Sequence, residues 1–181
     1  MRALISLVLI VVAGAYPAAV AAQGAEDDRE TCQKQSGDVA IAACGRAIAS
    51  GKFKGKSLAV IYVNRGAEWK DKNQTDKALA DYAAALKLDP GQPAIYNNRA
   101  NILGDRGDTD RALADYNTAI KLDPAYTAAY TNRGLLYEEK KSDYAKARAD
   151  FEAALKLPPK HSDGEWAQET ARQRLEALKD K

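Results

Sequence analysis

The stretch Ala112-Leu113-Ala114-Asp115-Tyr116 decides the fold, because near copies of it stand before and after it in the chain. The copies are Ala78-Leu79-Ala80-Asp81-Tyr82 and Ala147-Arg148-Ala149-Asp150-Phe151, so the three begin 34 and then 35 residues apart. A second element, Tyr-x-Asn-Arg followed by Gly or Ala, precedes each copy and begins at Tyr62, Tyr96 and Tyr130. A period of this length is typical of stacked helical hairpins, each of which buries its apolar face only against its neighbours.

Small residues recur at fixed places inside this period. In the first helix of each hairpin they are Gly66, Ala100 and Gly134. We expect them to face the alanines of the second helices, Ala78, Ala112 and Ala147, with the aromatic rings of the quoted stretches filling the space beside them. Small residues on both sides would let the two helix axes approach closely.

The order Tyr, Gly or Ala, then Ala, an aromatic residue, Ala and Pro at fixed offsets resembles the tetratricopeptide repeat, a helix–turn–helix module of about 34 residues. By this resemblance the complete units are 59–92, 93–126 and 127–161, with one inserted residue near Lys141. The resemblance implies an all-α, right-handed solenoid of helical hairpins. It also implies a concave face, lined by the first helices, on which members of the family usually bind extended peptides.

The segment 23–58 predicts a divergent first repeat. When Asp38 is aligned with Asp76, Cys44 takes the place of the ring of Tyr82. The next unit begins four residues late, and we expect residues 50–56 to form the extra loop. Such divergence is expected in a terminal unit, because it faces solvent on one side.

The chain has two cysteines, Cys32 and Cys44, which are 12 residues apart. The spacing suits a bridge between two antiparallel helices joined by a turn at 36–38, and an even pair in an exported protein indicates one disulfide. The alternative is a pair of free, buried thiols. A metal site is disfavoured, because two cysteines provide half of a zinc set and the lone His161 is distant in sequence.

Residues 1–22 differ in composition from the rest of the chain. One basic residue, Arg2, precedes an apolar run that ends at Val12, and small residues stand before the Ala22-Gln23 junction. This pattern predicts a cleaved secretory signal, and therefore a periplasmic or secreted protein without stable membrane insertion after cleavage. The alternative is an uncleaved membrane anchor, because the apolar segment is nearly long enough to span a bilayer.

Residues 162–181 predict an amphipathic helix that caps the last repeat. Its expected apolar stripe consists of Trp166, Thr170 or Ala171, Leu175 and Leu178. Ser162 and Glu165 fit a capping box at the start of this helix. The alternative is that the stripe is a partner-binding surface.

The composition limits the function classes. The formal charge of +2 comes from 27 basic and 25 acidic residues that are interspersed, which favours neither nucleic acid nor an anionic membrane as a partner. Catalysis has little support, because the one histidine lies beyond the repeats and no Gly-rich phosphate loop follows a strand. The adjacent Glu138 and Glu139 point apart on a helix, which is typical of solvated surface. We therefore expect no enzyme, no cofactor and no metal.

Charged residues also recur with the period, one on each helix of a hairpin. The arginines are Arg65, Arg99 and Arg133, and the aspartates are Asp81, Asp115 and Asp150. Because a matched acid is available for every arginine, the sequence predicts repeated Arg–Asp ion pairs. The alternative is a basic ladder that binds an acidic ligand.

The resemblance to the family also maps the candidate binding groove. Its predicted lining is Val63, Ala67, Lys70, Asn97, Asn98, Asn101, Asp105, Thr131, Asn132, Leu135 and Glu138. Some family members clamp a C-terminal carboxylate with Lys and Arg, but the corresponding places in this chain are Val63, Ala67, Asn98, Ala128 and Asn132. Binding of chaperone tails is therefore not expected.

These observations predict an exported scaffold that holds a protein or peptide partner in the cell envelope. One alternative is an adaptor that associates with itself or with a membrane complex through the convex face or the capping helix. Another is a small enzyme or a sugar-binding protein that uses the groove.

Overall fold

The computed structural model describes residues 16–159, 161–179 and 181, which contain helices and no β-strand. In chain order the helices are α1 (Tyr16–Lys34), α2 (Gly37–Ala49), α3 (Gly55–Asp71), α4 (Thr75–Leu88), α5 (Pro93–Asp105), α6 (Thr109–Leu122), α7 (Thr127–Leu136), the π-helix η1 (Tyr137–Lys141), α8 (Tyr144–Lys156) and α9 (Gly164–Ala177). The all-α prediction is confirmed. Residues 1–15 of the predicted signal lie outside the described residues, and none of the described helices is long and apolar enough to cross a membrane.

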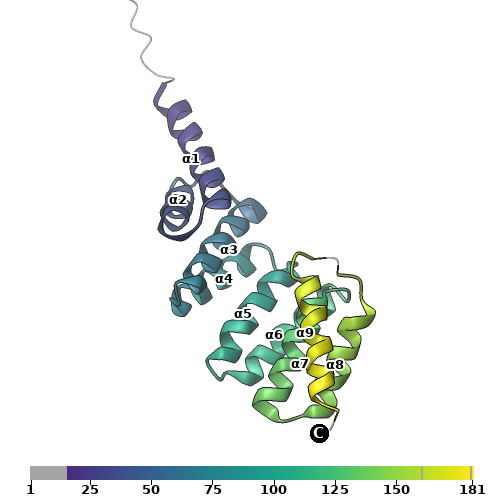
Figure 1. Cartoon of the computed structure of the whole chain (residues 1–181). Coiled ribbons are helices and arrows are strands. Elements are labelled where there is room, and N and C mark those ends of the chain that lie inside the picture. Colours follow the sequence, from purple (N-terminus) through teal and green to yellow (C-terminus); the bar gives the residue numbers. More distant parts are fainter. Residues whose placement is uncertain (1–15, 160, 180) are drawn as a thin grey trace, which may run out of the picture.

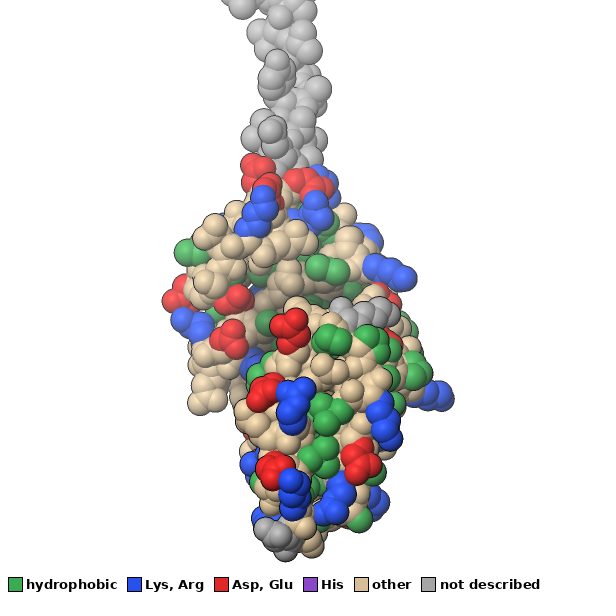
Figure 2. Space-filling view, turned by 45° about the vertical axis from the view of Figure 1, so that its right-hand side comes forward, with side chains coloured by type: hydrophobic (Ala, Val, Ile, Leu, Met, Phe, Trp, Pro, Cys, Tyr) green, Lys and Arg blue, Asp and Glu red, His purple; other side chains and the backbone are tan. Residues whose placement is uncertain are grey.

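The helices pair as four antiparallel hairpins that stack in chain order. Most contacts run within the pairs α1–α2, α3–α4, α5–α6 and α7–α8, and between each pair and the next. Figure 1 shows the resulting solenoid, with α9 packed across the last hairpin. In Figure 2, where the end that carries α9 comes forward, acidic, basic and apolar side chains alternate over the surface.

Close approach within a hairpin depends on a ring packed against a small residue. A Cβ added at Gly134 would lie 2.7 Å from a ring carbon of Phe151, and one added at Gly66 would lie 2.9 Å from a ring carbon of Tyr82. Both rings are completely buried. The glycines therefore contact the aromatic rings themselves, which corrects the prediction that they face the alanines of the second helices.

The predicted Arg–Asp pairs are confirmed in the three regular hairpins. In each, the arginine Nε and Nη2 donate to the two carboxylate oxygens of one aspartate over 2.6–2.8 Å, as in Arg65–Asp81, Arg99–Asp115 and Arg133–Asp150. The same guanidinium groups lie over the rings of Tyr62, Tyr96 and Tyr130. Hydrogen bonding to the aspartate raises the pKa of each arginine, so these side chains stay charged.

A second, exposed series of ion pairs joins consecutive hairpins. A basic residue at the turn of one hairpin reaches an aspartate in the first turn of the preceding second helix, as in Lys72–Asp38, Arg106–Asp76 and Lys141–Asp110. An aspartate at this place also suits the positive end of the helix dipole. The series includes α2, so the first hairpin stacks in the same register as the regular repeats.

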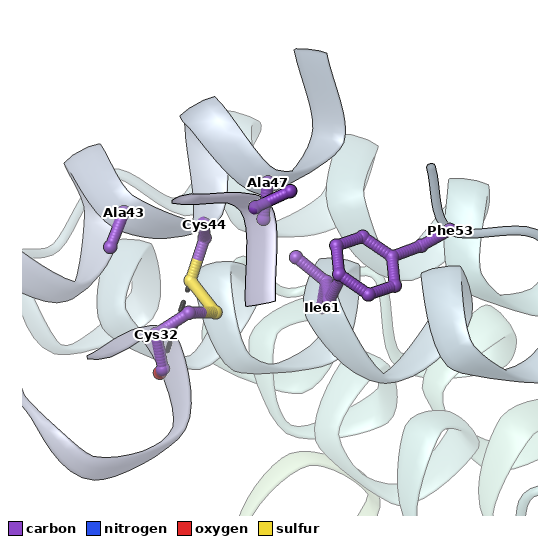
Figure 3. Close-up of a cluster of buried hydrophobic side chains, with 7 residues drawn as sticks. Cys32, Ala43, Cys44, Ala47, Phe53 and Ile61 are labelled. Atoms are coloured by element: carbon purple, nitrogen blue, oxygen red, sulfur yellow. Dashed lines mark hydrogen bonds between the residues drawn. A yellow bond between two sulfur atoms is a disulfide. The ribbon is translucent and has the colours of Figure 1, made fainter. Parts of the chain in front are cut away.

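The first hairpin is joined by the Cys32–Cys44 disulfide, whose Cα atoms are 4.8 Å apart. Figure 3 shows the bridge in a small buried cluster with Phe53 and Ile61. The predicted disulfide is therefore confirmed, but the predicted extra loop is too long. Helix α3 begins at Gly55, because the Ser57 hydroxyl and the main chain of Lys54 bond to each other and start it early.

The inserted residue of the last repeat lies inside a helix. The turns that end the first helices have a left-handed residue at Asn73, Gly107 and Ser142, so the extra residue precedes position 142. There the chain forms the π-helix η1, and π-turns are the usual way in which a helix takes in one residue. The insertion thus changes which side chains of residues 137–141 face inward.

Helix α9 takes the place that the first helix of a further hairpin would have. It packs on α7 and α8, and the Thr131 hydroxyl donates to the Ala167 carbonyl, much as Asn132 of α7 donates to Asn97 of α5. The buried residues of α9 are Gly164, Ala167 and Ala171, and Leu178, which follows the helix as its C-cap, is buried as well. Two predictions are wrong here. Trp166 is 52% exposed, since its neighbour Ala167 makes the contact with α7, and the N-cap is Asp163, without a side-chain capping bond.

Candidate functional site: a groove along the first helices

A groove of about 320 Å³ runs over the face formed by the first helices and α9. Helix α3 contributes Lys70, α5 contributes Asn101, Gly104 and Asp105, and the ring of Tyr116 reaches it from α6. The remaining wall consists of Asn132, Leu135 and Leu136 of α7, Glu139 and Lys140 of η1, and Trp166 of α9. The groove therefore brings together residues from three hairpins and the last helix.

Two amide side chains in the groove are held by other residues. Tyr116 donates its hydroxyl hydrogen to Asn101 Oδ1 over 2.6 Å, and Asn132 Nδ2 donates to Asn97 Oδ1 over 3.0 Å. These bonds leave the Nδ2 donors of Asn101 and the Oδ1 acceptor of Asn132 for other partners. Burial, together with the charges of Asp105 and Asp115, raises the pKa of Tyr116, so its hydroxyl remains a donor.

The rim of the groove carries both charges and one large aromatic ring. Among the described residues, no hydrogen bond or ion pair reaches the side chains of Lys70, Asp105 or Lys140. Trp166 stands beside them, half exposed. Such a groove offers donors and acceptors for a main chain, an apolar surface for one side chain, and charges of both signs.

The structure brings five of the eleven predicted groove residues into this groove. They are Lys70, Asn101, Asp105, Asn132 and Leu135. Asn97, Thr131 and Glu138 are instead buried in helix–helix contacts, since Asn97 bonds to α7 and Thr131 to α9. Ala67 and Asn98 are half-buried outside it, and Val63 lines a separate hollow.

Glu138 is the clearest departure from the sequence-based expectation. Its side chain is 8% exposed, and Oε2 accepts a 2.9 Å hydrogen bond from Nε of Arg174 on α9. Glu139, which follows it in the π-helix, lies 3.6 Å from the same guanidinium and lines the groove. The prediction that Glu138 is solvated surface is therefore wrong, because α9 covers it.

Six lining residues were missed by the sequence reasoning. They are Gly104, Tyr116, Leu136, Glu139, Lys140 and Trp166. The one-residue insertion could have indicated that Glu139 and Lys140 line the groove, since an added residue rotates the end of the helix. Nothing in the spacing of residues 162–181 indicated that Trp166, the largest residue of α9, would face the groove. Within the part of the chain that the structure describes, no group of three or more potential metal ligands is present.

Family models establish what the repeats are. A TPR repeat model matches residues 66–107 and 100–141, and a tetratricopeptide repeat model matches 127–161. These matches cover 66–161, which is more than half of the 181 residues. The chain belongs to the tetratricopeptide repeat family. A search of curated protein sequences gave no match.

Solved structures share the fold at low sequence identity. A tetratricopeptide repeat protein from Parabacteroides merdae is 22% identical over 87% of this chain and 63% of its own, with a TM-score of 0.66. The TPR domain of Arabidopsis OM64 is 28% identical, with 64% and 95% covered and a TM-score of 0.54. The first TPR of Spaghetti (RPAP3), bound to an HSP90 peptide, is 24% identical, with 67% and 98% covered and a TM-score of 0.57.

Proposed function

We propose that this protein is a non-enzymatic, exported scaffold whose groove binds an extended, internal segment of a partner protein. The observation that carries the proposal is that the side-chain amides of Asn101 and Asn132, on neighbouring helices of one groove, are each fixed by a hydrogen bond to another side chain. One presents a donor and the other an acceptor, which is the pair that a peptide group requires. Main-chain recognition of this kind tolerates many side-chain sequences.

The charges in the groove favour an internal segment over a chain terminus. The first TPR of Spaghetti is bound to a peptide of sequence SRMEEVD. Here Lys70 and Lys140 are accompanied by Asp105 and Glu139, so the groove has no net positive charge for a terminal carboxylate. The clamp positions named above likewise carry no lysine or arginine.

Two features support export to the cell envelope. The apolar segment 1–22 ends in small residues that suit a signal peptidase. Cys32 and Cys44 form a disulfide in the first hairpin, and disulfides persist mainly in oxidising compartments. Mass spectrometry of the protein from its native host tests this part. We expect a chain that begins at Gln23 and carries no free thiol, whereas a chain that begins at Met1 would contradict it.

A displayed peptide library tests the groove. We expect selection from random linear dodecamers, fused to the phage coat through their C-termini, to enrich binders although no free carboxylate is present. Asn101→Ala combined with Asn132→Ala should weaken binding of the selected peptides at least ten-fold, because each hydrogen bond between a side-chain amide and a peptide group contributes about 1 kcal/mol. Gln173→Ala is the matched control, since this exposed amide donates to Glu169 within α9 and does not line the groove.

Fluorescence reports where such a peptide binds. In a Trp69→Phe background, Trp166 is the only tryptophan of the chain. A peptide in the groove should therefore shift or quench the emission of Trp166. Peptides that bind equally well to the double variant, with no change in emission, would place the binding site elsewhere on the molecule.

A further inference from the structure

A separate hollow of about 140 Å³ lies on the same face, between the beginnings of α3 and α5. Ala59 and Ile95 form its floor and are each 2% exposed. Val60, which is 45% exposed, and Ala94 stand at its rim, and the loop residue Gln92 closes one side. The walls are predominantly apolar, and no helix or loop of the described chain covers the rim.

The next repeat shows what fits such a place. One period of 34 residues further along the chain, the position of Gln92 is taken by Tyr126. The ring of Tyr126 is 4% exposed and packs with Ala128 and Ala129, which correspond to Ala94 and Ile95. Between α5 and α7, therefore, the homologous space holds an aromatic ring from the chain itself.

Gln92 does not fill the hollow in this way. Its Nε2 donates to Asp89 Oδ2 over 2.8 Å, which turns the side chain toward the loop. The wall also differs in polarity, because Val63 stands where the next repeat has Asn97. The hydroxyl of Tyr126 donates to Asp163 Oδ2 over 3.3 Å, whereas Val63 can neither accept nor donate a hydrogen bond. Asp89 also lines the hollow, but its two carboxylate oxygens already accept from the Gly91 amide and from Gln92, so the hollow is matched to a ring without a hydroxyl.

Its size agrees with that chemistry. An apolar cavity of about 150 Å³ in another protein admits benzene. Burying the side chain of phenylalanine from water is also favourable enough to give at least ten-fold tighter binding than burying that of alanine.

We propose that this hollow binds one phenylalanine side chain of the partner segment whose main chain lies in the groove. The inference rests on the proposed function, because it names a residue of the same partner. Val63 lines the hollow and Lys70 lines the groove, and because they are spaced i and i+7 they lie along one face of α3. From Val60 to Lys70 the helix rises about 15 Å, which an extended chain spans in four to five residues. The phenylalanine therefore stands four to five residues from the part of the segment that lies beside Lys70.

Two tripeptide probes and methyl NMR test the hollow directly. Acetyl-Gly-Phe-Gly-amide should shift the methyl signals of Val63 and Ile95 saturably, and at least ten-fold more tightly than acetyl-Gly-Ala-Gly-amide. Gln92→Tyr should abolish this binding, because the new ring can enter the hollow as Tyr126 enters its own. Gln92→Ala is the matched control and should retain it. Equal binding of the two probes, or full binding to Gln92→Tyr, would overturn the inference.

A rim variant protects the test against a folding defect. Ala94 is exposed, so Ala94→Glu leaves the buried floor intact and places a charge at the mouth of the hollow. We expect at least a ten-fold loss for the phenylalanine probe and a circular dichroism spectrum like that of the wild type. Unchanged binding to a folded Ala94→Glu variant would again contradict the inference.

The outcomes separate this inference from the proposed function. If binding of the selected peptides is weakened by the Asn101 and Asn132 substitutions but not by Gln92→Tyr, the groove is supported and the phenylalanine site is contradicted. If the phenylalanine probe binds but the Asn101 and Asn132 substitutions leave peptide binding unchanged, the phenylalanine site is supported and the groove is contradicted. Sedimentation should show a monomer; a dimer that Gln92→Tyr dissociates would assign the hollow to a second copy and overturn the inference.

Discussion

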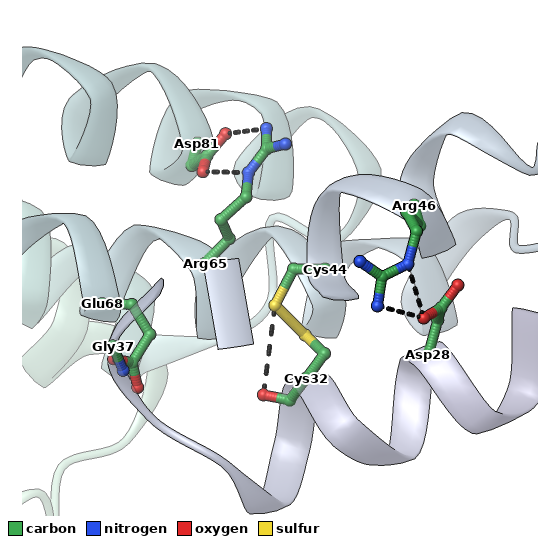
Figure 4. Close-up of a disulfide and its surroundings, with 8 residues drawn as sticks. All are labelled: Asp28, Cys32, Gly37, Cys44, Arg46, Arg65, Glu68 and Asp81. Atoms are coloured by element: carbon green, nitrogen blue, oxygen red, sulfur yellow. Dashed lines mark hydrogen bonds and ion pairs between the residues drawn. A yellow bond between two sulfur atoms is a disulfide. The ribbon is translucent and has the colours of Figure 1, made fainter. Parts of the chain in front are cut away.

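The first and second hairpins join two antiparallel helices by different means. In the second hairpin the ring of Tyr82 packs on Gly66, and the guanidinium of Arg65 binds both oxygens of the buried Asp81. In the first hairpin the Cys32–Cys44 disulfide joins the two helices, with Cys44 at the position that corresponds to Tyr82. The ion pair is reversed, because Asp28 is on the first helix and Arg46 on the second. Figure 4 shows the Arg65–Asp81 pair of the second hairpin, and the disulfide and the Asp28–Arg46 pair of the first.

The difference follows from the number of neighbours. The second hairpin packs against α2 on one side and α5 on the other, so a large ring between its helices is buried completely. Among the described residues the first hairpin has a neighbour on one side only, and Arg46 of its ion pair is 59% exposed. A covalent bridge stabilises a hairpin without requiring such burial, because it restricts the unfolded chain. We infer that the bridge stabilises a unit that has too little core of its own.

The largest expected effect comes from breaking a buried ion pair in a regular hairpin. Arg133→Met leaves the carboxylate of Asp150, which is 7% exposed, without its partner. We expect the free energy of unfolding to fall by about 3–5 kcal/mol, since an uncompensated buried charge is costly. Urea denaturation measures the loss. Arg46→Met in the first hairpin is the matched control and should cost far less stability, because that pair is exposed and screened by solvent. Equal losses would show that the two pairs are equivalent.

The second expected effect is that of the disulfide. Cys32→Ala combined with Cys44→Ala should lower the free energy of unfolding by about 2–3 kcal/mol, as expected for a closed loop of this length. The loss should be local. Hydrogen exchange should speed up for the amides of α1 and α2, while those of α5 and α6 keep their protection. Uniformly faster exchange along the chain would mean that the bridge stabilises the whole solenoid.

The third effect probes the contact that the disulfide replaces. Gly134→Ala places a Cβ against the ring of Phe151, and we expect a net loss of about 1–2 kcal/mol, because overpacking exceeds the gain in helix propensity. Thermal unfolding measures it. Gly24→Ala in α1 is the control, since an added Cβ there meets nothing within 4 Å, and it should be neutral or slightly stabilising. A neutral Gly134→Ala variant would mean that the ring can shift freely.

The repeats themselves were predictable because their period fixes contacts. Residues such as Arg65 and Asp81 recur at constant offsets on two helices, and only one pairing is consistent with every repeat. Cysteines 12 residues apart, on either side of a helical turn, were equally informative. These features depend on local spacing, which a sequence shows directly.

The groove was only partly predictable because it depends on how helices stack. The period assigns Asn97 and Thr131 to the first helices. The next first helix, or α9, packs so closely on each of them that both residues are buried. The insertion near Lys141 was visible in the sequence as a spacing of 35 instead of 34 residues. Its consequence, a π-helix that turns Glu138 toward Arg174, depends on the position of α9. Trp166 was misplaced for the same reason, since the size of the gap between α7 and α9 selects alanine over tryptophan.

The smallest expected effect compares two tyrosines at the same place in consecutive repeats. The hydroxyl of Tyr82 is buried without a hydrogen-bond partner among the described residues, because Ala67 stands where the next repeat has Asn101. The hydroxyl of Tyr116 bonds to that asparagine. Tyr82→Phe should therefore stabilise the protein by about 1 kcal/mol, whereas Tyr116→Phe should destabilise it by a similar amount. Chemical denaturation of both variants measures the opposite signs, and a destabilised Tyr82→Phe variant would mean that its hydroxyl has a partner. Because Tyr116 also holds Asn101 in place, Tyr116→Phe alone should weaken peptide binding in the groove, so the same pair of variants separates a purely structural ring from one that supports the site.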